Sequence, residues 1–296
     1  MKWYNLHMDY IREFTTDLKY VKNYSDNTVN AYESDLREFA EFLGGKDLDK
    51  ASNRDISEYA RTFTHKSERT LARTITTLRM FYDYLMARNY IKSNPMDGVV
   101  GPKIGRYLPE VLTIEEIERL LDLKPVNAFT FRDRCILELL YSTGLRISEL
   151  INLKFDNIMI DESLIKVMGK GSKERIVPLN DITTDYLKRY IEEVRPSMLK
   201  GIQTDFVFLN NHGKVLSRQA VFKMIKKRAV TVGIKKEISP HTLRHSFATH
   251  MLQNGADIRF IQELLGHSDV ATTEIYTHIA NERLKNDYND LNPRDN

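Results

Sequence analysis

The chain has 296 residues, of which 42% are hydrophobic and 29% are charged, and its formal net charge is +3 at pH 7. This length is sufficient for two domains, and the composition excludes a disordered or fibrous chain. The net charge is too small to indicate a nucleic-acid partner by itself, so any basic surface has to be local.

The single cysteine, Cys135, excludes an intramolecular disulfide. It lies among Ile136, Leu139 and Leu140, which predicts a small buried side chain, because a catalytic thiol needs polar surroundings. The first residues lack the continuous apolar stretch of a signal peptide, and no apolar run approaches membrane-spanning length. We therefore expect a cytoplasmic protein with no membrane partner.

Four amphipathic helices are predicted in about the first 90 residues, because apolar side chains recur there at helical spacing. Ser25 precedes the second helix, Ser52 and Asp55 form a capping box for the third, and the fourth begins near Ser67. In order, the apolar positions are Ile11, Phe14 and Leu18; Val29, Tyr32, Leu36, Phe39 and Leu43; Ile56, Tyr59 and Phe63; and Leu71, Ile75, Leu78, Tyr82 and Leu85. We expect a small helical bundle over residues 1–95.

A linker is predicted at residues 96–112, where turn-forming residues are dense. The stretch contains Gly98, Gly101, Pro102 and Gly105, with Lys103 and Arg106 among them. Thr113 and Glu116 then form a capping box, which begins a second domain over residues 113–296.

The second domain is predicted to be mainly helical with a small antiparallel sheet. Its first helices are expected around Ile114–Leu121 and Phe131–Ser142. Short strands are expected at Asn157–Ile160, Leu164–Met168 and Arg175–Leu179, with a turn at residues 169–172 joining the last two. Helices dominate again to the C-terminus, so the fold class is mainly α.

Two helices have a basic face that could follow a DNA backbone, because lysine and arginine supply most non-specific affinity for phosphates. One face carries Lys66, Arg69 and Arg73, and the other, on a helix beginning near Ser217, carries Lys223, Lys226, Lys227 and Arg228. Solvated helix faces explain both patterns as well, so the prediction of DNA contacts needs further support.

Two segments in the first half of the second domain place a basic residue beside glycine. Arg146 follows Thr143-Gly144-Leu145, where the glycine can end one helix and direct the next towards a site. Lys170 lies between Gly169 and Gly171, and the turn could bring its ammonium group close to a phosphate. Taken alone, Arg146 can also be explained as a surface or ion-pair arginine. Lys170, taken alone, can also be explained as part of a basic hairpin turn. The segment is not a P-loop, whose spacing is absent.

Two further segments lie nearer the C-terminus. Ser239 and Pro240 predict a helix start, which would place His241 and Arg244 on one face near a positive helix N-terminus. His245 and His250 suggest a metal site at first sight, but no carboxylate or thiol completes a ligand spacing, so we expect no metal. The last segment has His267 after Leu-Leu-Gly and Tyr276 nine positions later. Because the chain has 15 tyrosines, Tyr276 gains meaning only from the residues around it.

The whole set closely resembles the tyrosine recombinase family of the phage integrase type, whose members carry Arg, Lys, His-x-x-Arg, His or Trp, and Tyr in this order. The matching residues are Arg146, Lys170, His241, Arg244, His267 and Tyr276. The resemblance spans nearly the whole chain. The Thr-Gly-Leu-Arg segment and the stretch GHSDVATTEIYTHIANERL look most like the Xer recombinases, in particular the XerD subgroup.

The resemblance implies that Tyr276 attacks DNA and forms a covalent bond to its 3′ end. It further implies that His241 is the general base, Lys170 the general acid, and Arg146, Arg244 and His267 the groups that stabilise the transition state. No cofactor is implied. Glu149 could orient Arg146 or form an ordinary ion pair, and Arg175 and Lys173 are interpreted as structural or phosphate-holding.

For the domains, the resemblance implies a core-binding (SAM-like) helical DNA-binding domain at residues 1–95 and a catalytic domain at residues 113–296. It also implies a homo- or hetero-tetramer on double-stranded DNA at a dif-like inverted repeat, with a second Xer recombinase and a septal DNA translocase as further partners. The expected role is resolution of chromosome dimers at cell division. An integrase of a phage or mobile element, or a DNA-binding regulator that does not cut, is the alternative.

Near the C-terminus, Ile279, Leu284, Tyr288 and Leu291 recur at loosely helical spacing. This pattern fits a helix packed on its own domain. The family resemblance implies instead that the helix docks into a neighbouring protomer.

Overall fold

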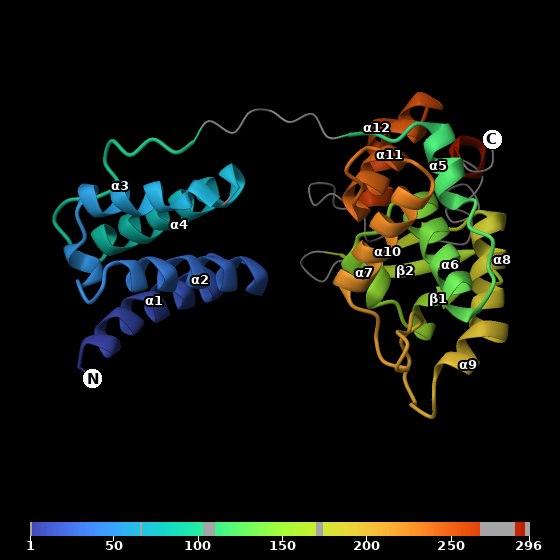
Figure 1. Ribbon diagram of the computed structural model, residues 1–296, viewed down its shortest axis with the longest axis horizontal. Coiled ribbons are helices and arrows are strands. Elements are labelled where there is room, and N and C mark those ends of the chain that lie inside the picture. The colour runs from blue at the N-terminus through green and yellow to red at the C-terminus, as the bar shows by residue number, and fades with distance from the viewer. Residues whose placement is uncertain (1, 66, 103–109, 170–173, 267–287, 294–296) are drawn as a thin grey trace. The chain divides into compact units, whose positions relative to one another are not determined.

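The computed structural model forms two compact units, Met1–Tyr107 and Leu108–Asn296 (Figure 1). It describes residues 2–65, 67–102, 110–169, 174–266 and 288–293. Both units are built mainly from helices, and the second adds a small antiparallel sheet, which confirms the predicted fold class. Among the described residues no helix is both long and apolar enough to cross a membrane.

The first unit is a bundle of four α-helices, as predicted, with two short 3-10 turns. The helices are α1 (Lys2–Tyr20), α2 (Asp26–Phe42), α3 (Asn53–Arg61) and α4 (Glu68–Ala87), and the turns are η1 (Leu48–Lys50) and η2 (Thr62–His65). The core of the bundle is rich in aromatic rings: Phe14 packs edge-on against Phe81, and Tyr59 packs edge-on against Phe63. These rings lie on the apolar faces that the helical spacing predicted.

Side-chain caps set the helix starts in this bundle. Ser25 accepts a hydrogen bond from the Thr28 main chain, and Ser67 accepts one from the Thr70 main chain, so α2 and α4 begin where the sequence predicted. The capping box of Ser52 is also present at α3.

Residues 94–102 pack on the bundle, although they include the start of the predicted linker. Met96 is buried in the core of the bundle, and the Val99 carbonyl accepts a hydrogen bond from Arg79 Nη2 at 2.7 Å. The amide of Asn53, at the start of α3, donates to the Pro95 and Asp97 carbonyls. The turn-rich composition therefore marks a segment that covers α3 and α4 before the chain leaves the bundle.

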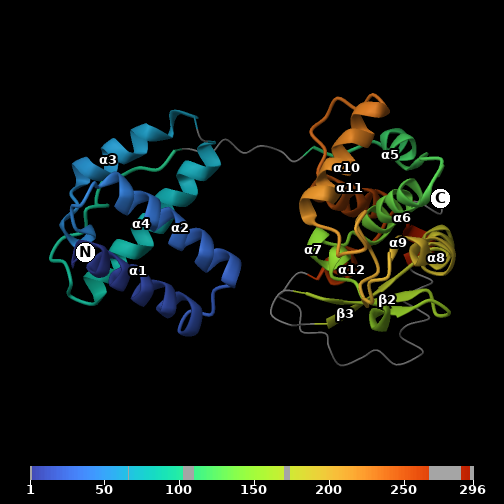
Figure 2. The same cartoon turned by 60° about the horizontal axis from the view of Figure 1, so that its bottom comes forward.

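The second unit surrounds α6 (Ala128–Thr143), which is buried on nearly all sides. Cys135 is fully buried there, as predicted. The other helices are α5 (Ile114–Leu121), α7 (Ile147–Ile151), α8 (Asp181–Arg189), α9 (Arg195–Met198), α10 (Arg218–Thr231), α11 (Pro240–Gln253) and α12 (Ile258–Leu265), with the 3-10 turn η3 (Phe155–Asn157) and the π-helical turn η5 (Tyr190–Val194). Helix α11 packs on α6, and α12 packs on α11 and on the sheet (Figure 2).

The sheet has three antiparallel strands in the order β1 (Ile158–Met159), β2 (Leu164–Met168) and β3 (Glu174–Pro178). Its register pairs Ile165 with Val177 and Met168 with Glu174. All three predicted strands are present, but the first is only two residues long, because Asn157 belongs to the preceding η3 turn.

The described end of the chain, residues 288–293, packs on the second unit. Tyr288 is fully buried and its hydroxyl donates to the Ser142 carbonyl at 2.6 Å. Asn292 Nδ2 donates to the same carbonyl at 3.1 Å, and Leu291 contacts the core. These residues therefore pack on their own unit in this chain. Docking of the terminal helix into a neighbouring protomer stays a prediction, and Ile279 and Leu284 lie outside the described residues.

Candidate active site

The turn between α6 and α7 places Arg146 at the site. Gly144 ends α6 in the left-handed conformation with φ +61°. A Cβ atom at this position would lie 2.7 Å from side-chain atoms of Leu265 and Phe247, so only glycine allows this close approach. The turn is thereby pressed against α11 and α12, and Arg146 follows it at the N-cap position of α7.

The first turn of α11 carries the two other described residues of the proposed catalytic set. Ser239 caps the helix by accepting a hydrogen bond from the Thr242 main chain at 3.1 Å, and Pro240 is the first helical residue. His241 follows and is exposed, whereas Arg244, one turn later, is half-buried. The predicted helix start is confirmed, and it directs both residues to the same end of α11.

Arg146 and Arg244 meet at the C-terminal end of α12. Arg244 Nη2 donates to the Leu265 carbonyl at 2.6 Å, and its Nη1 donates to the Gly144 carbonyl at 2.5 Å. Arg146 Nη2 donates to the Gly266 carbonyl at 3.1 Å. The last carbonyls of a helix have no partner within the helix and carry partial negative charge, so they orient the guanidinium groups while leaving other N–H groups to bind a ligand.

Glu149, on the first turn of α7, binds two arginines at once. Its carboxylate accepts hydrogen bonds from the Arg146 main chain at 2.7 Å and from Arg146 Nη1 at 3.0 Å. The same two oxygens accept from Arg175 Nη1 at 2.7 Å and Nη2 at 2.9 Å. Although burial alone raises the pKa of Glu149, the hydrogen bonds and charge of Arg175, and then the hydrogen bonds of Arg146, lower this pKa overall. Glu149 is therefore a buried carboxylate that holds Arg146 in place.

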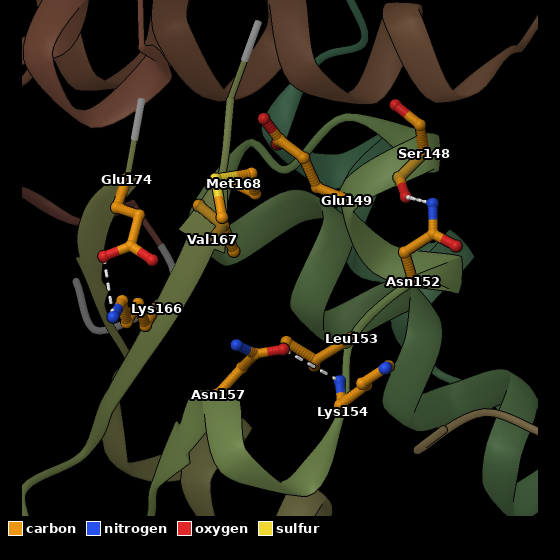
Figure 3. Close-up of a pocket in the computed structure, with 10 residues that line it drawn as sticks. All are labelled: Ser148, Glu149, Asn152, Leu153, Lys154, Asn157, Lys166, Val167, Met168 and Glu174. Carbon is orange, nitrogen blue, oxygen red and sulfur yellow. Dashed lines mark hydrogen bonds and ion pairs between the residues drawn. The ribbon is translucent and has the colours of Figure 1, made fainter. Parts of the chain in front are cut away.

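A cavity of about 360 Å³ lies between α7 and the strands β2 and β3 (Figure 3). Glu149 lines it together with Ser148 of α7 and Asn152, the residue that caps the end of α7. Lys166 and Glu174, which form an ion pair at 2.6 Å, lie on the strand side. The end of β2 at Met168 and the start of β3 at Glu174 thus lie beside this cavity.

The described part of the site has an excess of positive charge. Arg146 and Arg175 bind the carboxylate of Glu149, and Arg244 lies close enough to feel its charge. These four residues carry a formal charge of 3 − 1 = +2. Burial, and then the charge of Arg146, lowers the pKa of Arg244 to about 10, so this arginine stays charged at neutral pH. Paired guanidinium groups with unbalanced charge form a site for a phosphate anion.

Three residues of the proposed catalytic set, Lys170, His267 and Tyr276, lie outside the described residues, as does Lys66. Their neighbours in the chain are described: β2 and β3 flank residues 169–173, and Gly266 directly precedes His267. The structure thus brings together Arg146 and Arg244, and it places His241 on the same helix end as Arg244.

The histidines of α11 do not form a metal site within the described part of the chain. Among those residues, no group of three or more His, Cys, Asp or Glu side chains could hold a metal ion. His250 is buried in the core, with Nδ1 2.9 Å from the Tyr141 hydroxyl. Burial lowers the pKa of His250, so this side chain is neutral at pH 7.

The two basic helix faces contain residues of different kinds. Arg69 is exposed on α4, but Arg73 forms a two-pronged ion pair with the buried Asp35 of α2. On α10, Lys223, Lys226 and Lys227 are exposed. Arg228, in contrast, donates to the carbonyls of Leu120, Arg119 and Asp122 at the end of α5. Arg73 and Arg228 therefore have structural partners that their spacing alone could not reveal.

The sequence indicated a structural or phosphate-holding role for Arg175, but it did not reveal which groups this arginine binds. Its Nε donates to the Leu264 carbonyl at 2.7 Å, in addition to its bonds to Glu149. The alternation of the strand contained a signal, because Arg175, Val177 and Leu179 share one face and the two apolar residues predict that this face is buried. A buried arginine on such a face requires a carboxylate or carbonyl partner.

Comparison with known proteins agrees with this geometry. The Phage integrase family model matches residues 110–283, and the model of the phage integrase N-terminal SAM-like domain matches residues 11–89. The tyrosine recombinase XerD of Staphylococcus saprophyticus is 44% identical over 295 residues, which are 96% of this chain and 98% of the relative. XerD of Staphylococcus aureus is 42% identical over 290 residues, with the same shares covered.

The solved structures similar to this one include a XerH site-specific recombinase bound to a palindromic difH substrate, in a post-cleavage complex. It has a TM-score of 0.70 and 26% sequence identity, and the match covers 93% of this chain and 84% of that one. The near-complete match to XerD relatives does not favour a mobile-element integrase or a regulator that does not cut. The chain therefore belongs to the phage integrase family and is a site-specific tyrosine recombinase of the Xer type, similar to XerD.

Proposed function

We propose that this chain cuts and rejoins double-stranded DNA through a covalent 3′-phosphotyrosine bond at Tyr276. The observation that carries the proposal is the meeting of Arg146 and Arg244 at the end of α12, with unbalanced positive charge and with the exposed His241 one turn from Arg244. A covalent intermediate conserves the energy of the phosphodiester bond, so rejoining needs no nucleotide cofactor.

Each residue of the proposed set has a role that its chemistry allows. A tyrosine with a pKa near 10 is about one-thousandth ionised at pH 7, a deficit of roughly 4 kcal/mol, and His241 as general base lessens it. Arg146 and Arg244 bind the non-bridging oxygens, where charge develops in the transition state, and His267 donates a further hydrogen bond. Lys170 protonates the leaving 5′-oxygen. His241 returns its proton during rejoining.

The DNA is bound by both parts of the chain in this proposal. Residues 1–95 are the core-binding domain, and residues 96–112 connect it to the catalytic domain at residues 113–296. Residues 96–102 of this connection pack on the bundle. Lys66, Arg69 and Arg73 of the first part, and Lys223, Lys226 and Lys227 of α10, contact phosphates. The exposure of Arg69 and of the three α10 lysines supports this assignment, and for Arg73 the ion pair with Asp35 limits the contact.

The Xer relatives support a proposal for the assembly and the biological role. Four protomers act on two dif-like inverted repeats, either as one protein or together with a second Xer recombinase. In the cytoplasm, this reaction resolves chromosome dimers before division, with a septal DNA translocase as activator. The XerH relative bound to a palindromic difH substrate supports an inverted-repeat target.

The test is trapping of the covalent intermediate on a nicked duplex that carries a dif-like repeat from the host chromosome. The native protein should become attached to the DNA 3′ end, and the adduct should form equally well in EDTA. Tyr276→Phe should bind the duplex with unchanged affinity in a gel shift and give no adduct. The control is Tyr20→Phe, an exposed tyrosine of α1, which should leave the adduct unchanged.

An adduct that persists in Tyr276→Phe would contradict the assignment of the nucleophile. Loss of the adduct in EDTA would contradict a metal-independent reaction. Binding without an adduct in the native protein would instead support the regulator that does not cut.

A further inference from the structure

Three consecutive carbonyl groups end α12, and each accepts a hydrogen bond from a different arginine. The Leu264 carbonyl accepts from Arg175, the Leu265 carbonyl from Arg244 and the Gly266 carbonyl from Arg146. Two of these arginines are proposed to bind the scissile phosphate. The third, Arg175, has no assigned role in the reaction.

Arg175 differs from the other two in how its donors are used. Its side chain is only 8% exposed, against 29% for Arg146. Nε donates to the Leu264 carbonyl, and Nη1 and Nη2 donate to the two carboxylate oxygens of Glu149. All three nitrogens therefore bind protein groups, so Arg175 is directed towards the protein and not towards a DNA phosphate.

The contacts of Arg175 lead to Arg146 through Glu149. Glu149 accepts hydrogen bonds from Arg146 at its main-chain nitrogen and at Nη1. Without Arg175, the buried carboxylate would lose two charged donors and could shift towards Arg146 or towards the cavity that it lines. Either shift would move the guanidinium group that is proposed to bind the phosphate.

Arg175 also fixes the end of α12. Gly266 adopts φ +66°, and a Cβ atom at this position would lie 3.1 Å from Cδ and Nη1 of Arg175, so the helix end lies directly against this side chain. The Gly266 carbonyl is the one that Arg146 binds. Arg175 thus supports Arg146 on two sides, through Glu149 and through the helix end.

We infer that Arg175 is a positioning residue for DNA cleavage, which holds Arg146 in the geometry that neutralises the charge on the scissile phosphate. The inference rests on the proposed function. A lysine cannot replace Arg175, because one ammonium group cannot span the two carboxylate oxygens and the Leu264 carbonyl in a fixed plane. Misplacing a catalytic group by about 1 Å can slow a reaction by roughly a hundredfold.

The experiment compares single-turnover cleavage of two nicked duplexes by the full-length protein. One has a normal scissile phosphodiester, and the other has a methylphosphonate there, which lacks the negative charge that Arg146 neutralises. Arg175→Lys should bind both duplexes like the native protein and cleave the phosphodiester at least about tenfold more slowly. The ratio of the native rate to the variant rate should be smaller on the methylphosphonate. Arg146→Ala should likewise have a larger defect on the phosphodiester than on the methylphosphonate. So should Glu149→Gln, which weakens the contact between Arg175 and Arg146 at Glu149.

The matched control is Arg195→Lys. Arg195 is also a buried arginine of the second unit, and it donates to the Thr204, Phe206 and Val207 carbonyls away from the site. This variant should lower the melting temperature and leave the ratio of the two cleavage rates unchanged.

The positioning role would be overturned if Arg175→Lys slowed cleavage of both duplexes by the same factor. Its ratio of the two cleavage rates would then equal that of Arg195→Lys. If Arg175→Lys does not fold, the ratio of the two cleavage rates measured for Glu149→Gln tests the inference instead. If Arg146→Ala cleaves both duplexes normally, the assignment of Arg146 under the proposed function fails, and the inference fails with it.

Discussion

At the scale of the residue, the site depends on Glu149, whose carboxylate accepts hydrogen bonds from two arginines. Removing one partner of a buried ion pair costs more than the pair contributes, because the remaining charges stay buried without compensation. The lowered pKa of Glu149 makes this contribution dependent on pH.

Glu149→Gln should therefore lower the free energy of unfolding by about 3 kcal/mol at pH 7. Because the pKa of Glu149 is lower in the folded protein than in the unfolded chain, the unfolded chain binds more protons between these two values. The stabilisation is complete above pH 4.5, the ordinary value, and is lost as the pH falls through the folded pKa. Urea titrations from pH 7 to pH 3 should show a weaker pH dependence in the variant. If the free energy of unfolding of the two proteins changed equally with pH, this account would be refuted.

Lys170 gives a second prediction at this scale. If it protonates the leaving 5′-oxygen, Lys170→Ala should cleave ordinary DNA at least about a hundredfold more slowly. A duplex with sulfur at the 5′-bridging position has a better leaving group and should largely restore the rate of single-turnover cleavage. Equal defects on the two duplexes would mean that Lys170 only binds phosphate.

At the scale of the element, α2 and α4 are joined by a buried polar cluster around Asp35. This carboxylate is 2% exposed and accepts hydrogen bonds from Arg73, Thr74 and Thr77 of α4. A buried carboxylate needs such partners, so the cluster fixes how the two helices pack. Arg73 reaches this cluster from a face that is exposed as the helical spacing predicted, since its own side chain is 47% exposed.

Arg73→Ala should therefore destabilise the free protein by about 2 kcal/mol, because Asp35 stays buried and loses the charged donor that Arg73 supplies. Arg69→Ala, one turn earlier and exposed, should change stability by less than about 0.5 kcal/mol and weaken DNA binding. Urea denaturation and gel shifts at two salt concentrations would separate the two effects. A loss of DNA affinity in Arg73→Ala without any loss of stability would show that Arg73 acts mainly on phosphates.

At the scale of the whole molecule, the end of the chain closes on the helix that leads into the site. Tyr288 and Asn292 both donate to the carbonyl of Ser142, next to the end of α6, while Thr183 Oγ1 donates to the hydroxyl of Ser142. Two residues further on, Gly144 begins the turn that places Arg146. The packing of residues 288–292 thus supports the helix end from which this turn begins.

Tyr288→Ala should lower the free energy of unfolding of the free protein by about 3 kcal/mol, the usual cost of removing a buried aromatic ring. Thermal unfolding followed by circular dichroism at two protein concentrations would measure it, with the exposed Tyr20→Ala as control. The decrease should be the same at both concentrations, because the contact lies within one chain. A decrease that depends on protein concentration, or none at all, would instead support docking into a neighbouring protomer.

The sequence by itself determined the helices, the sheet, their caps and the chemistry of the family. Helical periodicity, Ser25, Ser52 and Ser67 act within a few residues, so local patterns suffice to predict the elements. The order of Arg146, His241 and Arg244 among the other residues of the set carried the resemblance.

The tertiary structure alone decided which basic residues serve the fold and which face the site. Arg175 and Glu149 are 26 residues apart, and Arg73 and Asp35 are 38 residues apart, so no local spacing links them. The pairing of buried charges is set by how the elements pack, because each charge requires a partner wherever burial places it. For this reason the sequence indicated that Arg146 belongs to the site, and the fold showed what holds it there.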